Sequence, residues 1–86
     1  MTEIIKFYAD WCGPCKSQYR ILDEIRREGY VFEWTDINIE DSSEENLSLV
    51  AQYGVRSIPT LVVLKEDSEP VVFRGFTPKE KLREVL

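Results

Sequence analysis

Apolar residues in this chain follow two patterns that alternate along its length. Short runs of β-branched and aromatic residues predict four strands, at residues 3–9, 30–38, 60–65 and 71–74. Apolar residues three or four positions apart predict three helices: one over residues 13–28, a short one that ends at Gly54, and a last one that begins near Pro78. The order β-α-β-α-β-β-α indicates an α/β fold, with a four-stranded mixed sheet flanked by three helices.

The ends and inner faces of the helices can also be predicted. Gly29 is expected to end the first helix. A hydroxyl residue followed three positions later by glutamate predicts a capping box at the start of the other two helices, Ser42 with Glu45 and Thr77 with Glu80. The apolar residues expected to face the core are Ile21, Leu22 and Ile25 in the first helix, Leu47, Val50 and Ala51 in the second, and Leu82, Val85 and Leu86 in the third.

The composition is that of one globular domain covering residues 1–86, with 43% hydrophobic and 31% charged residues. The 16 acidic and 11 basic residues give a net charge of −5, which argues against nucleic acid as a partner. No apolar run approaches the roughly 20 residues of a membrane span, and residues 1–3 do not open a signal peptide. We therefore expect a cytoplasmic monomer with no membrane contact.

The only two cysteines lie in the stretch Trp11-Cys12-Gly13-Pro14-Cys15, between a predicted strand and a predicted helix. Helical residues three positions apart are separated by roughly 5–6 Å, a distance that a disulfide can span. Cys12, at the helix N-terminus, is expected to be the reactive thiolate, and Cys15 the more buried thiol that completes the exchange. Gly13 would allow a tight turn and Pro14 suits the first helical turn, while Trp11 would place an apolar surface beside the reacting sulfur.

Other uses of two cysteines fit this chain less well. A structural disulfide that closes so short a loop constrains little of the unfolded chain and stabilises it little. A zinc site needs four ligands, and the chain has two cysteines and no histidine. The haem-attachment motif has histidine after its second cysteine, where this chain has Lys16. A redox-active dithiol that needs no bound cofactor is therefore favoured.

Two stretches, residues 6–16 (KFYADWCGPCK) and 53–60 (YGVRSIPT), resemble the thioredoxin family in sequence, order and spacing. The resemblance extends over nearly the whole chain. It implies a minimal thioredoxin fold and a reversible dithiol–disulfide exchange, with Cys12 as the nucleophile and Cys15 as the resolving thiol.

The same resemblance implies a docking surface for target proteins. Pro59 would follow a cis peptide bond and lie against the cysteines. The backbone of Ile58 would pair with an extended target segment. Trp11, Ile58 and the Gly75–Phe76 turn would frame the apolar part of this surface.

Some features depart from a full-length thioredoxin. The chain starts at the first strand of the sheet, so we expect it to lack the strand and helix that usually precede this strand. Its length is that of a glutaredoxin, but Gly13 and Pro14 form the thioredoxin insert. Only Gly75 stands where glutaredoxins use paired glycines to bind glutathione. The best description is a thioredoxin of glutaredoxin size.

Lys6 and Asp36 are a further departure. Thioredoxins usually carry a buried aspartate six residues before the nucleophilic cysteine and a lysine near it on the neighbouring strand. Here Lys6 aligns with the aspartate and Asp36 with the lysine, so the two charges have exchanged places.

The simpler interpretation of Lys6 and Asp36 is that Lys6 extends toward the sheet end and Asp36 is a solvated residue. An unpaired lysine inside a strand is costly, which favours a pair. Asp36 would then accept the proton of Cys15, and Lys6 would keep Asp36 ionised and help to stabilise the thiolates.

These observations predict an electron carrier that reduces disulfides in target proteins and is itself reduced by thioredoxin reductase or by the glutathione system. Glutathione-dependent reduction, as in glutaredoxins, is the first alternative. The second is a non-catalytic thioredoxin-like binding module, or a dimer that shares an iron–sulfur cluster between two Cys12 residues. An oxidase or isomerase fits less well, because strong oxidants of this fold carry a histidine between the cysteines, and this chain has none.

Overall fold

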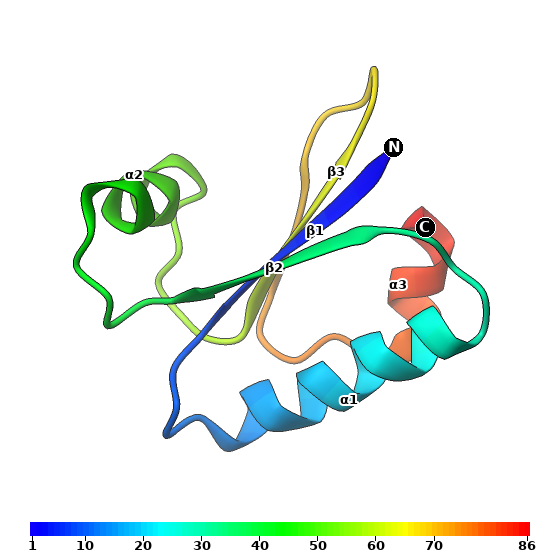
Figure 1. Ribbon diagram of the computed structural model, residues 1–86, viewed down its shortest axis with the longest axis horizontal. Helices are drawn as coiled ribbons and strands as arrows, with labels where there is room; N and C mark the ends of the chain where they lie inside the picture. Colours follow the sequence, from blue (N-terminus) through cyan, green and yellow to red (C-terminus); the bar gives the residue numbers. More distant parts are fainter.

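A computed structural model describes residues 1–86, and its helices and strands form three layers with the sheet in the middle (Figure 1). The elements in chain order are β1 (Thr2–Tyr8), α1 (Gly13–Arg27), β2 (Glu33–Asn38), α2 (Glu44–Gln52), β3 (Thr60–Lys65), β4 (Val71–Arg74) and α3 (Lys79–Val85). The strands lie in the order β2-β1-β3-β4; β1 and β2 are parallel and the other two pairings are antiparallel. The predicted order of elements and the four-stranded mixed sheet are confirmed.

The two middle strands are buried on both faces, which explains their continuous apolar sequence. Figure 1 shows α1 and α3 on one side of the sheet and α2 on the other. The core between the sheet and α1 and α3 contains Ile4, Leu22, Ile25, Phe32, Leu61, Val63 and Leu82. The core between the sheet and α2 is smaller, with Ile5, Phe7, Ile37 and Val62 buried in it. Lys6 has the same parity along β1 as Ile4, so it enters the layer beneath α1.

The second strand is shorter than predicted, because it begins at Glu33 instead of at residue 30. Its first pairing is with Glu3, one residue from the start of β1, so residues 30–32 have almost no neighbouring strand to pair with. Phe32 is instead buried in the core below α1 and α3, and Tyr30 packs against it. The apolar character of Tyr30 and Phe32 thus reflects burial and not strand pairing, whereas Val31 between them is 88% exposed.

The capping box predicted at Ser42 is wrong by one residue. The N-cap of α2 is Ser43, whose hydroxyl accepts a hydrogen bond of 3.3 Å from the backbone N–H of Asn46. The Asp41 carboxylate accepts a hydrogen bond of 3.1 Å from the Ser43 N–H, which holds Ser43 in the extended cap conformation. Asp41, Ser42 and Ser43 all have side chains that can cap a helix. The turn made by Asp41 determines that Ser43 is the N-cap.

The predicted inner face of α2 is also partly wrong. Leu49 and Val50 pack against the core below α2, while Leu47 and Ala51 are exposed. A helix that starts after Ser43 and contains no fully buried residue touches the sheet only along this narrow stripe. None of the helices in the structure is both long enough and apolar enough to cross a membrane.

The capping box predicted at Thr77 does not form either. Pro78 occupies the N-cap position of α3, with no side-chain hydrogen bond, and the Thr77 hydroxyl donates to the carbonyl of Gly75 at 3.2 Å. The backbone of Thr77 is held by the side chain of Gln18 from α1, which fixes the chain before α3 begins. This long-range contact decides how the helix starts.

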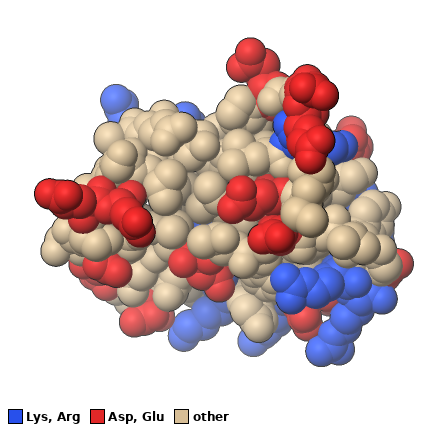
Figure 2. Space-filling model, turned by 45° about the horizontal axis from the view of Figure 1, so that its top comes forward, with Lys and Arg blue, Asp and Glu red and all other residues tan.

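Ion pairs join the ends of α1 and α3. Arg83 donates to both carboxylate oxygens of Glu28 at 2.7 Å, and Lys79 contacts Glu28 at 3.1 Å and Glu24 at 2.8 Å. These pairs lie at the surface, beside the junction of the two helices. In the view of Figure 2, acidic groups are spread over the visible face, while basic groups gather mainly along its lower edge.

Neutralising Glu28 should reduce the acid sensitivity of folding. Hydrogen bonds from Arg83 and Lys79 hold the pKa of Glu28 below its ordinary value of 4.5. A carboxyl group whose pKa is lower in the folded than in the unfolded protein stabilises the folded state. This contribution is complete at a pH above the pKa of the unfolded state, and it is lost as the pH falls through the pKa of the folded state. We expect Glu28→Gln to lower the melting temperature at about pH 7 by roughly 1–5 °C and to flatten the decline below about pH 4.5.

Thermal unfolding followed by circular dichroism across the acid range would measure both effects. Glu69→Gln is the matched control, because Glu69 is an exposed residue that forms no ion pair in the structure. Identical pH profiles for the two variants would show that the pairs between α1 and α3 do not stabilise the fold.

Candidate active site

The two cysteines form a disulfide at the N-terminus of α1, with Cα atoms 5.2 Å apart. Cys12 is the N-cap residue, and its Sγ accepts a hydrogen bond of 3.1 Å from the backbone N–H of Cys15. This N–H group and the positive end of the helix would stabilise a thiolate on Cys12 once the disulfide is opened. Only 4% of Cys12 and 2% of Cys15 is exposed, so the position on the helix, more than burial, distinguishes the two.

Gly13 and Pro14 form the first turn of α1, where a proline is tolerated because its missing N–H is not needed. The tight turn lies earlier than predicted, since the Cys12 N–H donates to the Ala9 carbonyl at 3.1 Å. Gly13 does not adopt a left-handed conformation, and a Cβ atom there would have no neighbour within 4 Å. Its lack of a side chain therefore keeps the surface beside the disulfide open.

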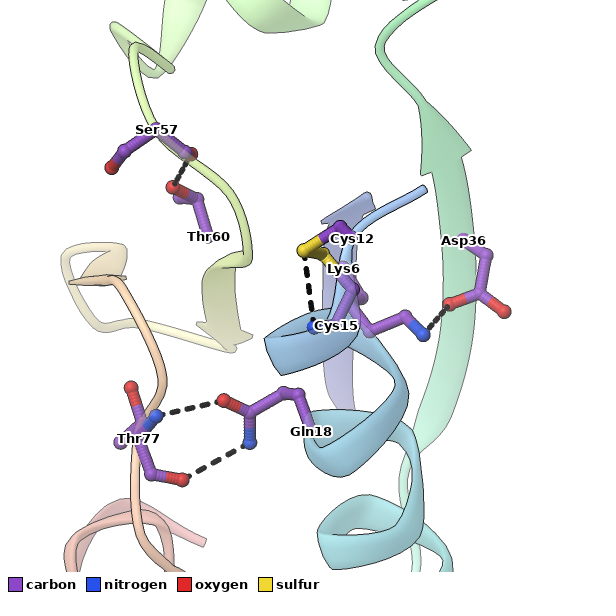
Figure 3. Close-up of a disulfide and its surroundings, with 8 residues drawn as sticks. All are labelled: Lys6, Cys12, Cys15, Gln18, Asp36, Ser57, Thr60 and Thr77. Carbon is purple, nitrogen blue, oxygen red and sulfur yellow. Dashed lines mark hydrogen bonds and ion pairs between the residues drawn. A yellow bond between two sulfur atoms is a disulfide. The ribbon is translucent and has the colours of Figure 1, made fainter. Parts of the chain in front are cut away.

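Pro59 lies at the same end of the sheet as the cysteines. β1 and β3 are antiparallel, with Phe7 opposite Thr60. The loop after β1, which leads to Cys12, and the loop before β3, which carries Pro59, therefore leave the sheet at one edge. Figure 3 shows the second loop beside the disulfide.

The loop before β3 is held internally but leaves one residue free to pair. The Ile58–Pro59 peptide bond is cis, and the Thr60 hydroxyl donates to the Ser57 carbonyl at 2.7 Å. Gly75 donates its N–H to the Pro59 carbonyl at 2.9 Å, which connects this loop to the Gly75–Phe76 turn. The backbone N–H and C=O of Ile58 make no hydrogen bond within the chain. Both groups are therefore available to an incoming strand.

An apolar groove adjoins the disulfide. Its volume is about 480 Å³, and it is lined by Trp11, Ile39, Val50, Val55, Arg56, Ser57 and Ile58. Trp11 is 68% exposed, and its indole N–H donates to the Glu40 carboxylate at 3.0 Å, which fixes the ring at the edge of the groove. Phe76 is also exposed but does not line this groove. The structure thus brings Trp11 and Ile58 together in one groove.

Lys6 and Asp36 face each other on the parallel strands β1 and β2, as register partners. Lys6 Nζ lies 3.5 Å from Asp36 Oδ1, and the side chains are 5% and 39% exposed, respectively. The Trp34 indole N–H donates to the same oxygen at 2.9 Å. A buried cation is therefore paired with a carboxylate that reaches solvent.

Aromatic rings complete the surroundings of the Lys6 ammonium group. Nζ lies 5.0–5.9 Å from the ring centroids of Tyr19, Tyr8 and Trp34. Rings at this distance attract a cation through their negative faces, which compensates part of the cost of removing it from water. Sequence reasoning identified the charged pair but not this aromatic cage.

A cleft connects the charged pair with the second cysteine. Its volume is about 470 Å³, and it is lined by Lys6, Tyr8, Ala9, Asp10, Cys15, Lys16, Tyr19, Arg20 and Asp36. Figure 3 shows Lys6 extending past the disulfide toward Asp36 on the neighbouring strand. Cys15 and Asp36 thus line the same cleft, although only 2% of Cys15 is exposed.

Gln18 is a buried residue of the site region that sequence reasoning missed. Its amide donates to the Thr77 carbonyl at 3.0 Å and accepts from the Thr77 N–H at 2.7 Å (Figure 3). The contact joins the helix of the cysteines to the segment that follows the Gly75–Phe76 turn. A signal was present, since Gln18 falls on the same helical stripe as Leu22 and Ile25, and a polar residue on an apolar stripe implies a buried partner.

Replacing Gln18 with methionine should destabilise the protein strongly. The side chain keeps nearly the same volume, but the N–H and C=O of Thr77 lose their partners inside the protein. Two unsatisfied backbone groups cost about 2–5 kcal/mol in the free energy of unfolding. Urea denaturation of the oxidised protein would measure it. Gln52→Met is the control at an exposed position, and an equal loss in both variants would contradict this role of Gln18.

Comparison with known proteins covers nearly the whole chain. Residues 2–86 match the family model described as Thioredoxin. A thioredoxin from Staphylococcus aureus is 42% identical over 86 residues, which cover 99% of this chain and 79% of the relative. A mutant thioredoxin from Halobacterium salinarum has a similar structure, with a TM-score of 0.77 and 32% identity over 98% of this chain and 70% of that one. For chloroplastic thioredoxin z the TM-score is 0.79, with 27% identity over 99% of this chain and 74% of that one.

Proposed function

Because this chain belongs to the thioredoxin family and is a thiol–disulfide oxidoreductase, we propose that it reduces target proteins with Cys12 as nucleophile and Cys15 as resolving thiol. The observation that carries this proposal is the position of Cys12 as the N-cap of α1, where its sulfur accepts the Cys15 N–H. A thiolate at this position gains a hydrogen bond and a favourable helix dipole.

The reaction consists of two thiol–disulfide exchanges. The Cys12 thiolate attacks one sulfur of a target disulfide, the target's S–S bond breaks, and the departing target thiolate takes up a proton. The Cys15 thiolate then attacks Cys12 in the resulting mixed disulfide and releases the second target thiol. The target gains two electrons and two protons, and the chain ends as the Cys12–Cys15 disulfide.

Asp36 is proposed to accept the proton that Cys15 loses before its attack. Cys15 and Asp36 line one cleft, and the carboxylate is partly exposed, so a water molecule can pass the proton between them. Lys6 Nζ lies 3.5 Å from Asp36 Oδ1 and pairs with this carboxylate. It also places a positive charge in the cleft of Cys15, which favours the attacking thiolate.

The target is proposed to bind as an extended segment across Ile58. The free backbone groups of Ile58 would pair with it, as in the addition of a strand to a sheet edge. Trp11 and Ile58 offer an apolar surface beside the disulfide, and the open surface at Gly13 and Pro14 admits the target sulfur. Further contacts are assigned to Pro59, Gly75 and Phe76.

Thioredoxin reductase is proposed as the electron donor, in the cytoplasm, where thiols are kept reduced. Insulin reduction driven by NADPH and thioredoxin reductase should be faster than reduction driven by glutathione and glutathione reductase. Equilibration with glutathione should give a reduction potential of roughly −270 to −200 mV. Faster turnover with glutathione would assign a glutaredoxin-like role, and a potential near about −120 mV would contradict a reductant.

A further inference from the structure

Two of the longer segments that lack acidic residues in this acidic chain each carry an arginine near the cysteine end of the sheet. Asp and Glu number 16 in 86 residues, yet none occurs in residues 46–65 or 70–79. The first segment carries the loop before β3, with Arg56, and the second carries the end of β4, with Arg74. Both therefore contribute positive charge at the end of the sheet where the cysteines lie.

Arg74 is held in place by the end of α2. Its guanidinium group donates to the Gly54 carbonyl at 2.9 Å and to the Tyr53 carbonyl at 3.4 Å. α2 has no basic residue in its own last turn, so Arg74 complements the negative end of the helix. These partners are neutral, and the full positive charge of Arg74 remains uncompensated.

Arg56 lies next to Arg74. The two side chains and Gly54 line a hollow of about 330 Å³. The cations in ion pairs are Lys6, Arg27, Lys79, Arg83 and the N-terminal amine, so neither Arg56 nor Arg74 has a carboxylate partner. Two unpaired guanidinium groups around one hollow repel each other, and an anion placed between them would be attracted by both.

This hollow adjoins the surface on which a target is proposed to lie. Arg56 also lines the apolar groove, together with Trp11 and Ile58. Arg74 directly precedes Gly75, whose N–H binds the Pro59 carbonyl. Trp11, which also lines the groove, is bonded to the carboxylate of Glu40, so the groove adjoins one acidic and one basic side chain.

We propose that Arg56 and Arg74 form a binding site for an acidic residue of the target, so that disulfides flanked on one side by Asp or Glu are preferred. The arginines can hold a carboxylate through the donors of Arg56 and the free donors of Arg74. This site depends on the proposed function, because it selects among targets of the Cys12–Cys15 reaction.

The test uses peptides that contain one disulfide and differ at a single flanking residue, Glu, Gln or Lys. Two series place this residue before or after the disulfide, because the direction of the bound segment determines which flank faces the arginines. Values of kcat/KM are measured with dithiothreitol as donor for the full chain, Arg56→Glu, Arg74→Gln and Lys81→Gln. Lys81→Gln is the matched control, since it removes an exposed, unpaired positive charge on α3.

In one series, the unmodified protein should reduce the Glu peptide about fivefold faster than the Lys peptide at low salt, and the ratio should approach one at about 1 M salt. Arg56→Glu should reverse the preference, Arg74→Gln should weaken it, and Lys81→Gln should leave it unchanged. Equal rates on all peptides in both series, or a preference that survives in Arg56→Glu, would overturn the acidic-residue site. Failure to reduce any peptide would instead contradict the proposed function.

Discussion

Replacing Cys12 with serine should abolish disulfide reduction, whereas replacing Cys15 with serine should stop the reaction at a mixed disulfide. Without Cys12 no sulfur is available at the helix N-terminus, and we expect turnover to fall on the order of a thousandfold or more. Without Cys15 the first exchange still occurs, but no thiolate can release the target. Non-reducing electrophoresis after incubation with a disulfide-bonded protein would show the covalent complex.

The two serine variants are matched controls for each other, because each removes one sulfur and keeps the size of the side chain. The complex must form with Cys15→Ser and must disappear on addition of excess dithiothreitol. A covalent complex formed by Cys12→Ser but not by Cys15→Ser would reverse the assigned roles. The same trapped complexes, recovered from cell extract, would identify the natural targets.

Replacing Asp36 with asparagine should slow the reduction of insulin by roughly tenfold to a hundredfold while leaving the fold intact. Asparagine keeps an oxygen that can accept the Trp34 N–H, so the variant removes the charge and retains the hydrogen bond. Resolution by Cys15 should become the slow step, because the proton acceptor is gone. Stopped-flow release of the target from the mixed disulfide would measure this step directly.

Lys6→Met tests the other member of the pair. It leaves Asp36 without its cation and should shift the pH dependence of cysteine reactivity between about pH 6 and 9. Combining Lys6→Met with Asp36→Leu removes both charges and should recover part of the stability that Lys6→Met loses, while resolution by Cys15 stays slow because the proton acceptor is absent. Asp10→Asn removes another carboxylate that lines the same cleft and should have a smaller effect than Asp36→Asn. Wild-type rates in both single variants across this pH range would show that the pair has no catalytic role.

Much of the fold could be predicted from local features of the sequence. The spacing of buried apolar residues differs between helices and strands. This spacing therefore located all seven elements and their order. The spacing of the cysteines and the presence of Pro14 predicted that a helix begins at Cys12. Both are features of a single helical turn, so they do not depend on distant residues. Resemblance to the thioredoxin family then predicted that the loop with Ile58 and Pro59 lies beside the cysteines.

Helix caps were less predictable, although they also look local. Ser42 and Ser43 have the same chemistry, and a bond from Ser43 to Asp41 decides between them. Thr77 has the side chain of a good cap, but its backbone is bound by Gln18, 59 residues away. Competition among several weak hydrogen bonds determines each cap, and the sequence pattern does not rank them.

The chain by itself determined the elements, their order and the chemistry at Cys12 and Cys15, because these follow from neighbours a few residues apart. Only the tertiary structure decided what surrounds them: the aromatic rings around Lys6, the hold of Gln18 on the loop before α3, and the hollow shared by Arg56 and Arg74. Each of these contacts joins residues from different segments of the chain. They exist because the pairing of β1 with β2, the pairing of β3 with β1 and β4, and the packing of α1 against the sheet bring these segments together.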